Sequence, residues 1–339
     1  MSIADQKAVT IEATGAHHYP SMGGVRAAEA WKRASTDAGG PDSSELPDFN
    51  VWNIDAVRSA GGWLDRHTDA DVHEVGELSD EIDIDIEYDL EDRNLREPFT
   101  FAQQCDGDRV QNLIPRQGME LQNGNSGRVA LGWHSDDSVL EESYRADNLV
   151  LVGVDNPHRV PTQLVPVKEI VRHLDAADVK SLSEPRYEFP CPESFALDGA
   201  RDYTVRGEVV LREASDGWHI RFATYSTKPV PGDRKGELAL RALTHAIANT
   251  EPVEIVLLPG SAVTFSNSKY LHSRGSVTGR RWIKRVYLKR DLSAIRAAAQ
   301  LPKGWLFDLE VILEASLASR SYNVSLDPRI GSGQTSRSA

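Results

Sequence analysis

The sequence predicts a mainly β fold with helical additions, arranged as a sandwich or a jelly roll. Short apolar runs bounded by turn residues recur along the chain, as at 148–154, 254–258 and 282–288. The Asp216-Gly217 pair between two further runs, 208–212 and 219–225, is typical of a β-hairpin. Few helical patterns interrupt these runs, and many short strands with few helices indicate two packed sheets.

Two helices and one acidic strand complete this reading. An apolar stripe at helical spacing predicts a helix over 237–248, and a second helix is expected over 293–300. In the acidic stretch 75–96, residues 82–88 alternate isoleucine with acidic side chains, which predicts a strand with one solvated face. A calcium loop is the alternative, but the glycine and glutamate spacing of an EF-hand is missing. The stretch could also form a lid over a pocket.

Composition divides the 339 residues into one domain with loose ends. Residues 1–47 are rich in Ala, Gly, Ser, Asp and Pro, which predicts a poorly ordered segment. Residues 48–325 are expected to form a single domain, because β sandwiches and barrels often run long. Residues 326–339 are expected to form a flexible tail.

Charge and cysteine content exclude several classes of protein. The 38 Lys and Arg against 51 Asp and Glu give a net charge of −13, which argues against a nucleic-acid partner. Cys105 and Cys191 are too few for a disulfide framework or a cysteine zinc site. The first residues lack the apolar region of a signal peptide, and no run approaches the ~20 apolar residues of a membrane helix. We therefore expect a soluble cytoplasmic protein with a small-molecule substrate; its oligomeric state stays open.

Two separated fragments carry the chemistry. Trp133-His134-Ser135-Asp136 places a histidine and a carboxylate two residues apart, so both face the same side of a strand. Tyr270-Leu271-His272 adds a second histidine, which strands of a jelly roll can bring alongside. Two histidines and one carboxylate on one face form the iron site of non-haem Fe(II) oxygenases. Asp137 competes with Asp136, but adjacent strand residues face opposite ways, which favours Asp136.

Other readings of the same residues stay open. A histidine and an aspartate two residues apart occur often by chance, and most histidines are structural. A zinc hydrolase would use the same three residues with a general base nearby. A jelly-roll binding protein without catalysis would use the downstream arginines to bind an anion. Dependence on O2 separates the enzyme classes.

The surrounding motifs extend the pattern over much of the chain. Residues 101–115 lead into Trp133-His134-Ser135-Asp136-Asp137, followed by Tyr144-Arg145-Ala146-Asp147-Asn148-Leu149, Asp155-Asn156-Pro157 and Arg281-Trp282-Ile283-Lys284-Arg285-Val286-Tyr287. In this order they resemble the clavaminate synthase-like family of Fe(II)/2-oxoglutarate oxygenases, in the branch that hydroxylates free arginine, lysine or asparagine. The resemblance covers about residues 100–290. It implies a double-stranded β-helix, the cupin-like form of the jelly roll, as the core of the domain.

The resemblance also implies roles for individual residues. His134, Asp136 and His272 would bind Fe(II). Arg281 matches the arginine that pairs with the remote carboxylate of 2-oxoglutarate, and Thr162 matches a threonine that hydrogen-bonds it. Arg285 matches the arginine that holds the substrate carboxylate, and Gln103 or Gln104 matches a glutamine near the substrate amine. Which of Arg281 and Arg285 holds 2-oxoglutarate stays open, because the loop between His272 and Arg281 is shorter than in the family. The neighbouring Lys284 is expected to point into solvent.

The implied reaction is hydroxylation of an unactivated C–H bond of a free amino acid or a close derivative. Fe(II), 2-oxoglutarate and O2 would be required, with succinate and CO2 as coproducts, and specialised metabolism is the implied setting. Desaturation or cyclisation is the alternative outcome. Asp136 argues against halogenation, since related halogenases lack this carboxylate. The family branch usually has glutamate here, and residues 222–227 lack the acidic pair that grips arginine, which implies another side chain.

Overall fold

The computed structural model describes a large central part of the chain. The described residues are 9–12, 49–54, 57, 82–91, 97–116, 118–121, 124, 126–192, 195 and 203–326. Within the segment 1–47, Val9–Glu12 form strand β1. The rest of that segment, and the predicted tail beyond Leu326, lie outside the described residues.

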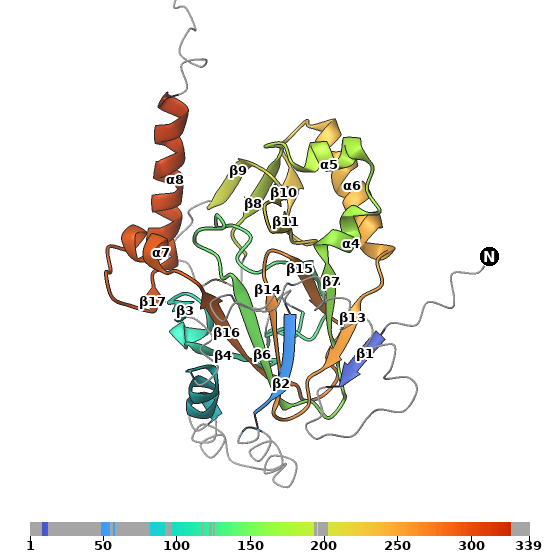
Figure 1. Ribbon diagram of the computed structural model, residues 1–339, viewed down its shortest axis with the longest axis vertical. Helices are drawn as coiled ribbons and strands as arrows, with labels where there is room; N and C mark the ends of the chain where they lie inside the picture. The colour runs from blue at the N-terminus through green and yellow to red at the C-terminus, as the bar shows by residue number, and fades with distance from the viewer. Residues whose placement is uncertain are drawn as a thin grey trace, which may run out of the picture.

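Two facing sheets form the centre of the described structure (Figure 1). The smaller sheet has the order β1, β13 (Val253–Val256), β7 (Thr162–Pro166), β15 (Tyr270–Arg274) and β5 (Leu131–His134). The larger sheet has the order β17 (Leu306–Phe307), β3 (Glu97–Phe101), β16 (Trp282–Lys289), β6 (Asn148–Asp155), β14 (Ser261–Ser266) and β2 (Phe49–Asn53). Strand β4 (Val110–Leu113) also pairs with β16. This is the predicted jelly roll, with sheets that do not close into a barrel.

Strand β6 of the larger sheet is apolar on both faces because both faces are covered. In β6, Leu151 points into the core between the two sheets, where it joins Leu164 of the smaller sheet. Val150 and Val152 point the other way and pack against the apolar side chains of residues 82–91. Strand alternation therefore explains why β6 reads as one continuous apolar run.

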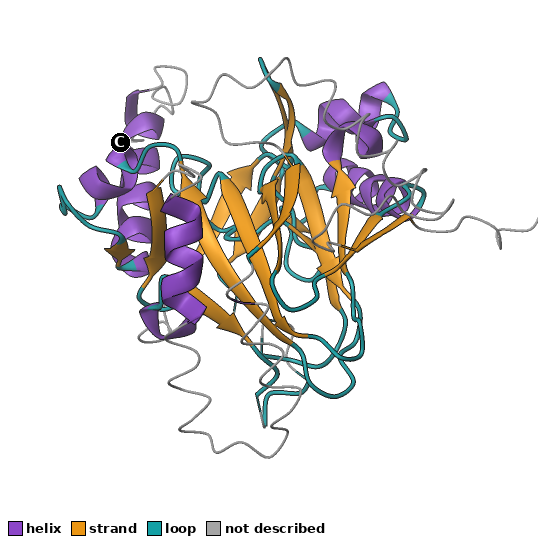
Figure 2. Ribbon diagram, turned by 60° about the horizontal axis from the view of Figure 1, so that its bottom comes forward, coloured by secondary structure: helices purple, strands orange, loops and turns teal. Residues whose placement is uncertain are grey.

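Helices and small sheets cover the outside. On the outer face of the smaller sheet lie α4 (Val167–Val171), α5 (Ala176–Leu182), α6 (Arg234–Ala248), the hairpin of β10 (Leu211–Ala214) with β11 (Gly217–Ile220), and the sheet of β12 (Lys228–Pro229), β8 (Tyr187–Pro190) and β9 (Thr204–Glu208). Beside the larger sheet lie η1 (Cys105–Gly107), α7 (Ser293–Ala298) and α8 (Leu309–Leu326). Figure 2 shows the strands in the middle with helices on either side. No helix among the described residues is long and apolar enough to cross a membrane.

Most predicted elements are confirmed, with shifted ends. The hairpin turns at Asp216-Gly217, where Gly217 has a φ of +120° that glycine adopts without strain. Helix α6 begins earlier than predicted because the Asp233 side chain accepts a hydrogen bond from the Gly236 amide at 3.0 Å and caps the first turn.

The predicted strand at 82–88 is wrong. Residues 82–91 are helical. Ile82, Ile86 and Leu90 are buried against the outer face of the larger sheet, whereas Ile84 is 53% exposed. Residues four apart lie on one face of a helix, so a helix buries Ile82, Ile86 and Leu90 together. The predicted strand, with its period of two, accounted only for residues 82, 84 and 86.

Lys284 corrects a second expectation, because it does not point into solvent. Its side chain is fully buried on the outer face of β16 and forms an ion pair with Asp83 of the helical segment. The helix over this face encloses a position that would otherwise be exposed. A buried lysine requires such a partner, since an unpaired charge in the interior is costly.

We expect Asp83→Asn to lower the free energy of unfolding by about 3 kcal/mol, because it removes the carboxylate charge that pairs with the buried Lys284 ammonium. Chemical denaturation measures this loss. Asp85→Asn is the matched control: the same change two residues along the same helix, at a carboxylate with no described ion pair, should cost less than about 0.5 kcal/mol. Equal losses in the two variants would contradict the importance of the Lys284–Asp83 pair.

Candidate active site

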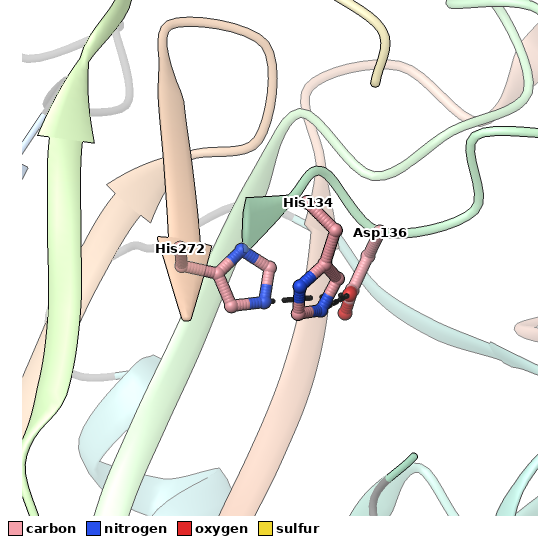
Figure 3. A group of neighbouring side chains, drawn as sticks. All are labelled: His134, Asp136 and His272. Carbon is pink, nitrogen blue, oxygen red and sulfur yellow. Dashed lines mark ion pairs between the residues drawn. The ribbon is translucent and has the colours of Figure 1, made fainter. Parts of the chain in front are cut away.

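His134, Asp136 and His272 come together between the two sheets (Figure 3). The antiparallel pairing of β5 with β15 places His272 directly opposite His134. The Nε2 atoms of His134 and His272 lie 3.3 and 3.4 Å from Oδ1 of Asp136. One ligand atom from each residue lies within 4.8 Å of the others, and all three residues are buried. This convergence is what the sequence predicted for these residues.

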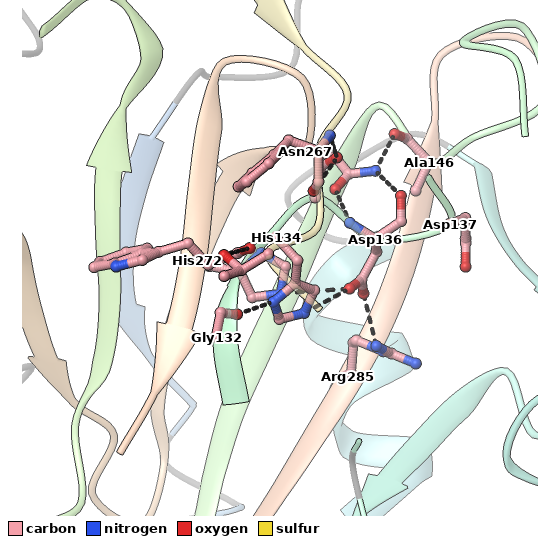
Figure 4. Close-up of polar contacts among 12 residues, drawn as sticks. Gly132, His134, Asp136, Asp137, Ala146, Asn267, His272 and Arg285 are labelled. Carbon is pink, nitrogen blue, oxygen red and sulfur yellow. Dashed lines mark hydrogen bonds and ion pairs between the residues drawn. The ribbon is translucent and has the colours of Figure 1, made fainter. Parts of the chain in front are cut away.

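The position of Asp136 has a different cause from the predicted one. Strand β5 ends at His134, so strand alternation no longer applies to the two aspartates that follow. Instead, the side chain of Asn267 accepts a hydrogen bond from the Asp136 amide at 2.8 Å and donates to the Asp136 and Ala146 carbonyls (Figure 4). This amide bridge fixes the turn and directs the Asp136 carboxylate towards the histidines.

The two oxygens of Asp136 have separate surroundings. Oδ1 faces the histidines, while Oδ2 accepts hydrogen bonds from Nη1 of Arg285 at 2.6 Å and from the Tyr287 hydroxyl at 3.0 Å. Burial opposes ionisation, but the charge of Arg285 and hydrogen bonding to His134 and His272 hold the pKa of the Asp136 carboxyl well below its usual range. The carboxylate is therefore ionised and has one oxygen directed at the histidines.

His272 presents the neutral form that a metal requires. Burial, followed by the neighbouring His134, lowers the pKa of His272 to about 4. Nδ1 of His134 lies 2.8 Å from the Gly132 carbonyl oxygen, which favours a proton on Nδ1 and a lone pair on Nε2. Two imidazole nitrogens and one carboxylate oxygen suit Fe(II) and leave its remaining positions open, so this donor set fits a non-haem iron centre.

A cavity beside His134 and His272 contains the predicted arginine clamp. We call it the Arg281 cavity; it is lined by Thr162, His272, Arg274, Arg281 and Ile283, among others. Nη2 of Arg281 donates to the Thr162 hydroxyl at 3.1 Å, and its buried Nε has no hydrogen-bond partner. Burial and the nearby Arg274 lower the pKa of Arg281 to about 9. Among the described residues the guanidinium has no anionic partner, which a carboxylate in the cavity would supply.

A second cavity lies beside Asp136, the third residue of the set. We call it the Asp137 cavity; it is lined by Gln104, His134, Asp136, Asp137, Tyr225 and Arg285, among others. His134 and Arg285 line both cavities. The candidate iron site thus lies between a cavity suited to an anion and a strongly polar one.

Arg285 has partners that the sequence did not reveal. Its Nη1 donates to Asp136, and its Nε donates to the Gln111 side-chain oxygen at 2.8 Å, because β4 pairs Gln111 with Arg285. Arg281, just before β16, and Arg285 within it both line the Arg281 cavity, in line with the predicted shared face. Arg285 pairs with Asp136, whereas Arg281 has no anionic partner among the residues that the structure describes. The geometry therefore favours Arg281 over Arg285 as the clamp; both roles stay predictions.

Gln103 and Gln104 have different surroundings. Gln104 lines the Asp137 cavity, where Nε2 donates to Asp137 at 3.1 Å and to the Tyr287 hydroxyl at 3.0 Å. Gln103 points elsewhere: its Oε1 accepts from the Leu309 amide at 2.8 Å, at the start of α8. Of the two alternatives, Gln104 is the one placed to meet a substrate.

Sequence reasoning missed several residues of this site. Tyr287 could have been found from the sequence, since it continues the even spacing of Arg281 and Arg285 and lies two residues after Arg285 in β16. No sequence pattern indicated Asn267 or Gln111, because each forms its hydrogen bonds with a residue more than a hundred positions away. Asp137 was set aside, yet it is buried in the cavity with a left-handed φ of +54°. Burial and the Asp136 charge raise its pKa to about 7.

Comparison with known proteins identifies the class. The chain matches the family described as "Taurine catabolism dioxygenase TauD, TfdA family" over residues 62–287. This is more than half of the 339 residues, and the chain therefore belongs to that dioxygenase family. The membership agrees with the resemblance found in the sequence.

Individual relatives are amino-acid oxygenases. The chain is 28% identical to an L-asparagine oxygenase of Streptomyces coelicolor over 60% of this chain and 61% of the relative. It is 28% identical to an enduracididine beta-hydroxylase of Streptomyces hygroscopicus, over 63% and 69%. Among solved structures, the non-haem iron oxygenase OrfP, in complex with Fe, succinate and (3S)-hydroxy-L-Arg, has a TM-score of 0.57 and 27% identity over 64% of this chain and 70% of OrfP. These likenesses confirm the jelly-roll oxygenase fold. The chain spans less than two thirds of the length of the asparagine oxygenase.

Proposed function

We propose that this protein is an Fe(II)/2-oxoglutarate-dependent dioxygenase that hydroxylates an unactivated C–H bond of a free amino acid or a close derivative. It uses O2 and releases succinate and CO2. The observation that carries the proposal is the buried set of two histidines and one carboxylate between the Arg281 cavity and the Asp137 cavity. One side meets the needs of a dicarboxylate cosubstrate, and the other those of a polar substrate.

The residues around the metal position have three different roles. His134, Asp136 and His272 hold Fe(II), which when bound supplies the activation of O2. Arg285 and Tyr287 hold Oδ2 of Asp136, so that Oδ1 stays directed at the metal position. The apolar walls of the cavities, such as Leu131 and Ile283, exclude water from the reacting groups.

The Arg281 cavity holds 2-oxoglutarate. Arg281 and Thr162 bind its remote carboxylate through charge-assisted and neutral hydrogen bonds. This contact fixes the position and orientation of 2-oxoglutarate, so that its other end lies beside His134 and His272. The OrfP structures with Fe and succinate and with Fe and alpha-ketoglutaric acid support 2-oxoglutarate as the cosubstrate.

The Asp137 cavity holds the amino-acid substrate. Gln104 and Arg285 line it, and Arg285 offers the positive charge that a substrate carboxylate requires. The named substrates of the relatives, asparagine and enduracididine, support an amino acid or a close derivative. Desaturation or cyclisation would use the same site with a different placement of the substrate carbon.

We also propose a single oxygenase domain over 48–325, with its core at about 100–290, and a cytoplasmic location. The family match over 62–287 and the strands from β2 to β17 support the domain. The two free cysteines agree with a reducing compartment.

Succinate formation tests the function and finds the substrate. The protein with Fe(II), ascorbate and 2-oxoglutarate is incubated in air with each common L-amino acid, and products are examined by mass spectrometry. Succinate stimulated by one amino acid, with a product heavier by one oxygen atom, is the expected result. A product lighter by two hydrogens would indicate desaturation or cyclisation. Absence of 2-oxoglutarate turnover by iron-loaded protein would contradict the proposal and favour a hydrolase or a binding protein.

A further inference from the structure

A third cavity is separate from the two at the metal site. Its lining residues come from three segments, 141–145, 208–212 and 219–221, and its volume is about 320 Å³. This volume is within the range of small-molecule sites. We call it the Arg145 cavity. Among the described residues it shares no lining residue with the Arg281 cavity or the Asp137 cavity. A ligand here would therefore occupy a position that the proposed reaction does not use.

Most charged side chains of the Arg145 cavity are paired with one another. Glu142 forms ion pairs with Arg212 and with Nδ1 of His219, the latter at 2.7 Å. Burial opposes ionisation of Glu142, but its hydrogen bond with His219 lowers the pKa of that carboxyl to about 2, so it stays charged. Nη1 of Arg221 donates to the Glu208 carboxylate at 2.8 Å. These pairs compensate the charges of Arg212 and Arg221.

Arg145 is the exception among these arginines. It is 4% exposed, and its Nε and Nη1 atoms are buried without any hydrogen-bond partner. Its guanidinium forms no ion pair with a described residue, and Glu142 and Asp137 influence it only electrostatically. Its backbone is held in place, because the Arg145 carbonyl accepts a hydrogen bond from Nζ of Lys289 at 2.7 Å. A guanidinium stays protonated at neutral pH, so a buried positive charge is left without a partner in this cavity.

We propose that the Arg145 cavity binds a small ligand through a single carboxylate group, which the Arg145 guanidinium holds. One unpaired positive charge calls for one negative charge, and the planar guanidinium matches the two oxygens of a carboxylate. Glu141 and Glu142 line the same cavity and would repel a doubly charged phosphate. The site requires neither Fe(II) nor 2-oxoglutarate and goes beyond the proposed function.

Nuclear magnetic resonance of the full chain, with its arginines labelled with nitrogen-15, tests the site directly. The probes are sodium acetate and acetamide, which has nearly the same shape without the charge, at constant ionic strength. The Nε–H resonance of Arg145 is assigned by its loss in Arg145→Lys. We expect acetate to shift this resonance saturably and to bind about 10-fold or more tightly than acetamide, because a hydrogen bond to a charged group is the stronger one. Arg241, on the surface of α6 and paired with Glu237, is the control and should show no saturable shift.

Arg145→Met provides a second measurement. The melting temperature without ligand should not fall below that of the wild type, because the lost charge has no ion-pair partner among the described residues. Arg241→Met makes the same change on the surface and shows the effect of the substitution alone. A clear fall in Arg145→Met, but not in Arg241→Met, would overturn the proposal, since it would show that the protein itself compensates the charge of Arg145.

The remaining outcomes also decide the proposal. A saturable shift at Arg145 with acetate, absent with acetamide and absent at Arg241, supports the carboxylate site. No shift at Arg145, or an equal shift with acetamide, overturns it. Sodium phosphate that binds at Arg145 as tightly as acetate would overturn the assignment to a carboxylate. None of these results depends on iron or on 2-oxoglutarate turnover, so the proposed function stands or fails separately.

Discussion

Replacing Asp136 by asparagine is expected to lower 2-oxoglutarate turnover by more than about 100-fold. Groups that merely support a metal ligand contribute about 10–100-fold, and Asp136 is the ligand itself in this account. Its Oδ1 lies between the Nε2 atoms of both histidines, and an amide oxygen there binds Fe(II) far less strongly than a carboxylate. Anaerobic titration with Fe(II), together with succinate formation, measures both losses.

The choice of substitution matters because Asp136 also accepts a hydrogen bond from Arg285. Alanine would leave the Arg285 guanidinium buried without its acceptor and would destabilise the fold, whereas asparagine keeps an oxygen for it. Asp85→Asn, at a helix outside the site, is the control and should keep wild-type turnover. Undiminished iron binding and turnover in Asp136→Asn would show that this carboxylate is not a ligand.

Replacing Arg281 by methionine is expected to raise the KM for 2-oxoglutarate by about 100-fold. A charged guanidinium pair with a carboxylate is worth several kcal/mol when buried, and Arg281 is 5% exposed. The melting temperature without ligand should not fall, because Arg281 lacks an anionic partner in the described structure and its burial is unfavourable. Stabilisation by added 2-oxoglutarate should shrink in the variant.

Arg280→Met is the matched control for this experiment. Arg280 is the preceding residue, 46% exposed, and pairs with Asp155 away from the cavity. Its replacement should leave the KM for 2-oxoglutarate within about two-fold of the wild type. Arg285→Met addresses the alternative clamp. A larger rise in this KM for Arg285→Met than for Arg281→Met would assign the cosubstrate to Arg285 and contradict the account.

The fold was predictable where the pattern had a single interpretation. Strands such as 148–154 and 282–288 are too short and too rich in β-branched residues for helices, and they formed where expected. Residues 82–91 failed because their apolar residues fit both a period of two and a spacing of four. Packing against the outer face of the larger sheet selected the helix, and the same packing buried Lys284.

The candidate site was predictable in its residue types and less so in its contacts. The even spacing of Arg281 and Arg285 predicted that both would face the same cavity, but the chain order gave no sign that β4 would bring Gln111 to Arg285. Likewise, Gln103 and Gln104 look equivalent in the sequence, and only the packing of α8 distinguishes them. Asp137 was not expected in the site because side chains alternate along a strand, but this alternation no longer holds beyond His134, where β5 ends. Partners distant in sequence decide such details.

Labelling with oxygen-18 gas tests the central claim most directly. The iron-loaded protein is supplied with 2-oxoglutarate, the amino acid selected by the panel and labelled O2, and both products are analysed by mass spectrometry. The account predicts one labelled oxygen atom in succinate and label in the hydroxylated amino acid, with neither product formed by Asp136→Asn. Succinate without label, or an amino-acid product that takes its oxygen from water alone, would contradict the assignment as a 2-oxoglutarate-dependent dioxygenase.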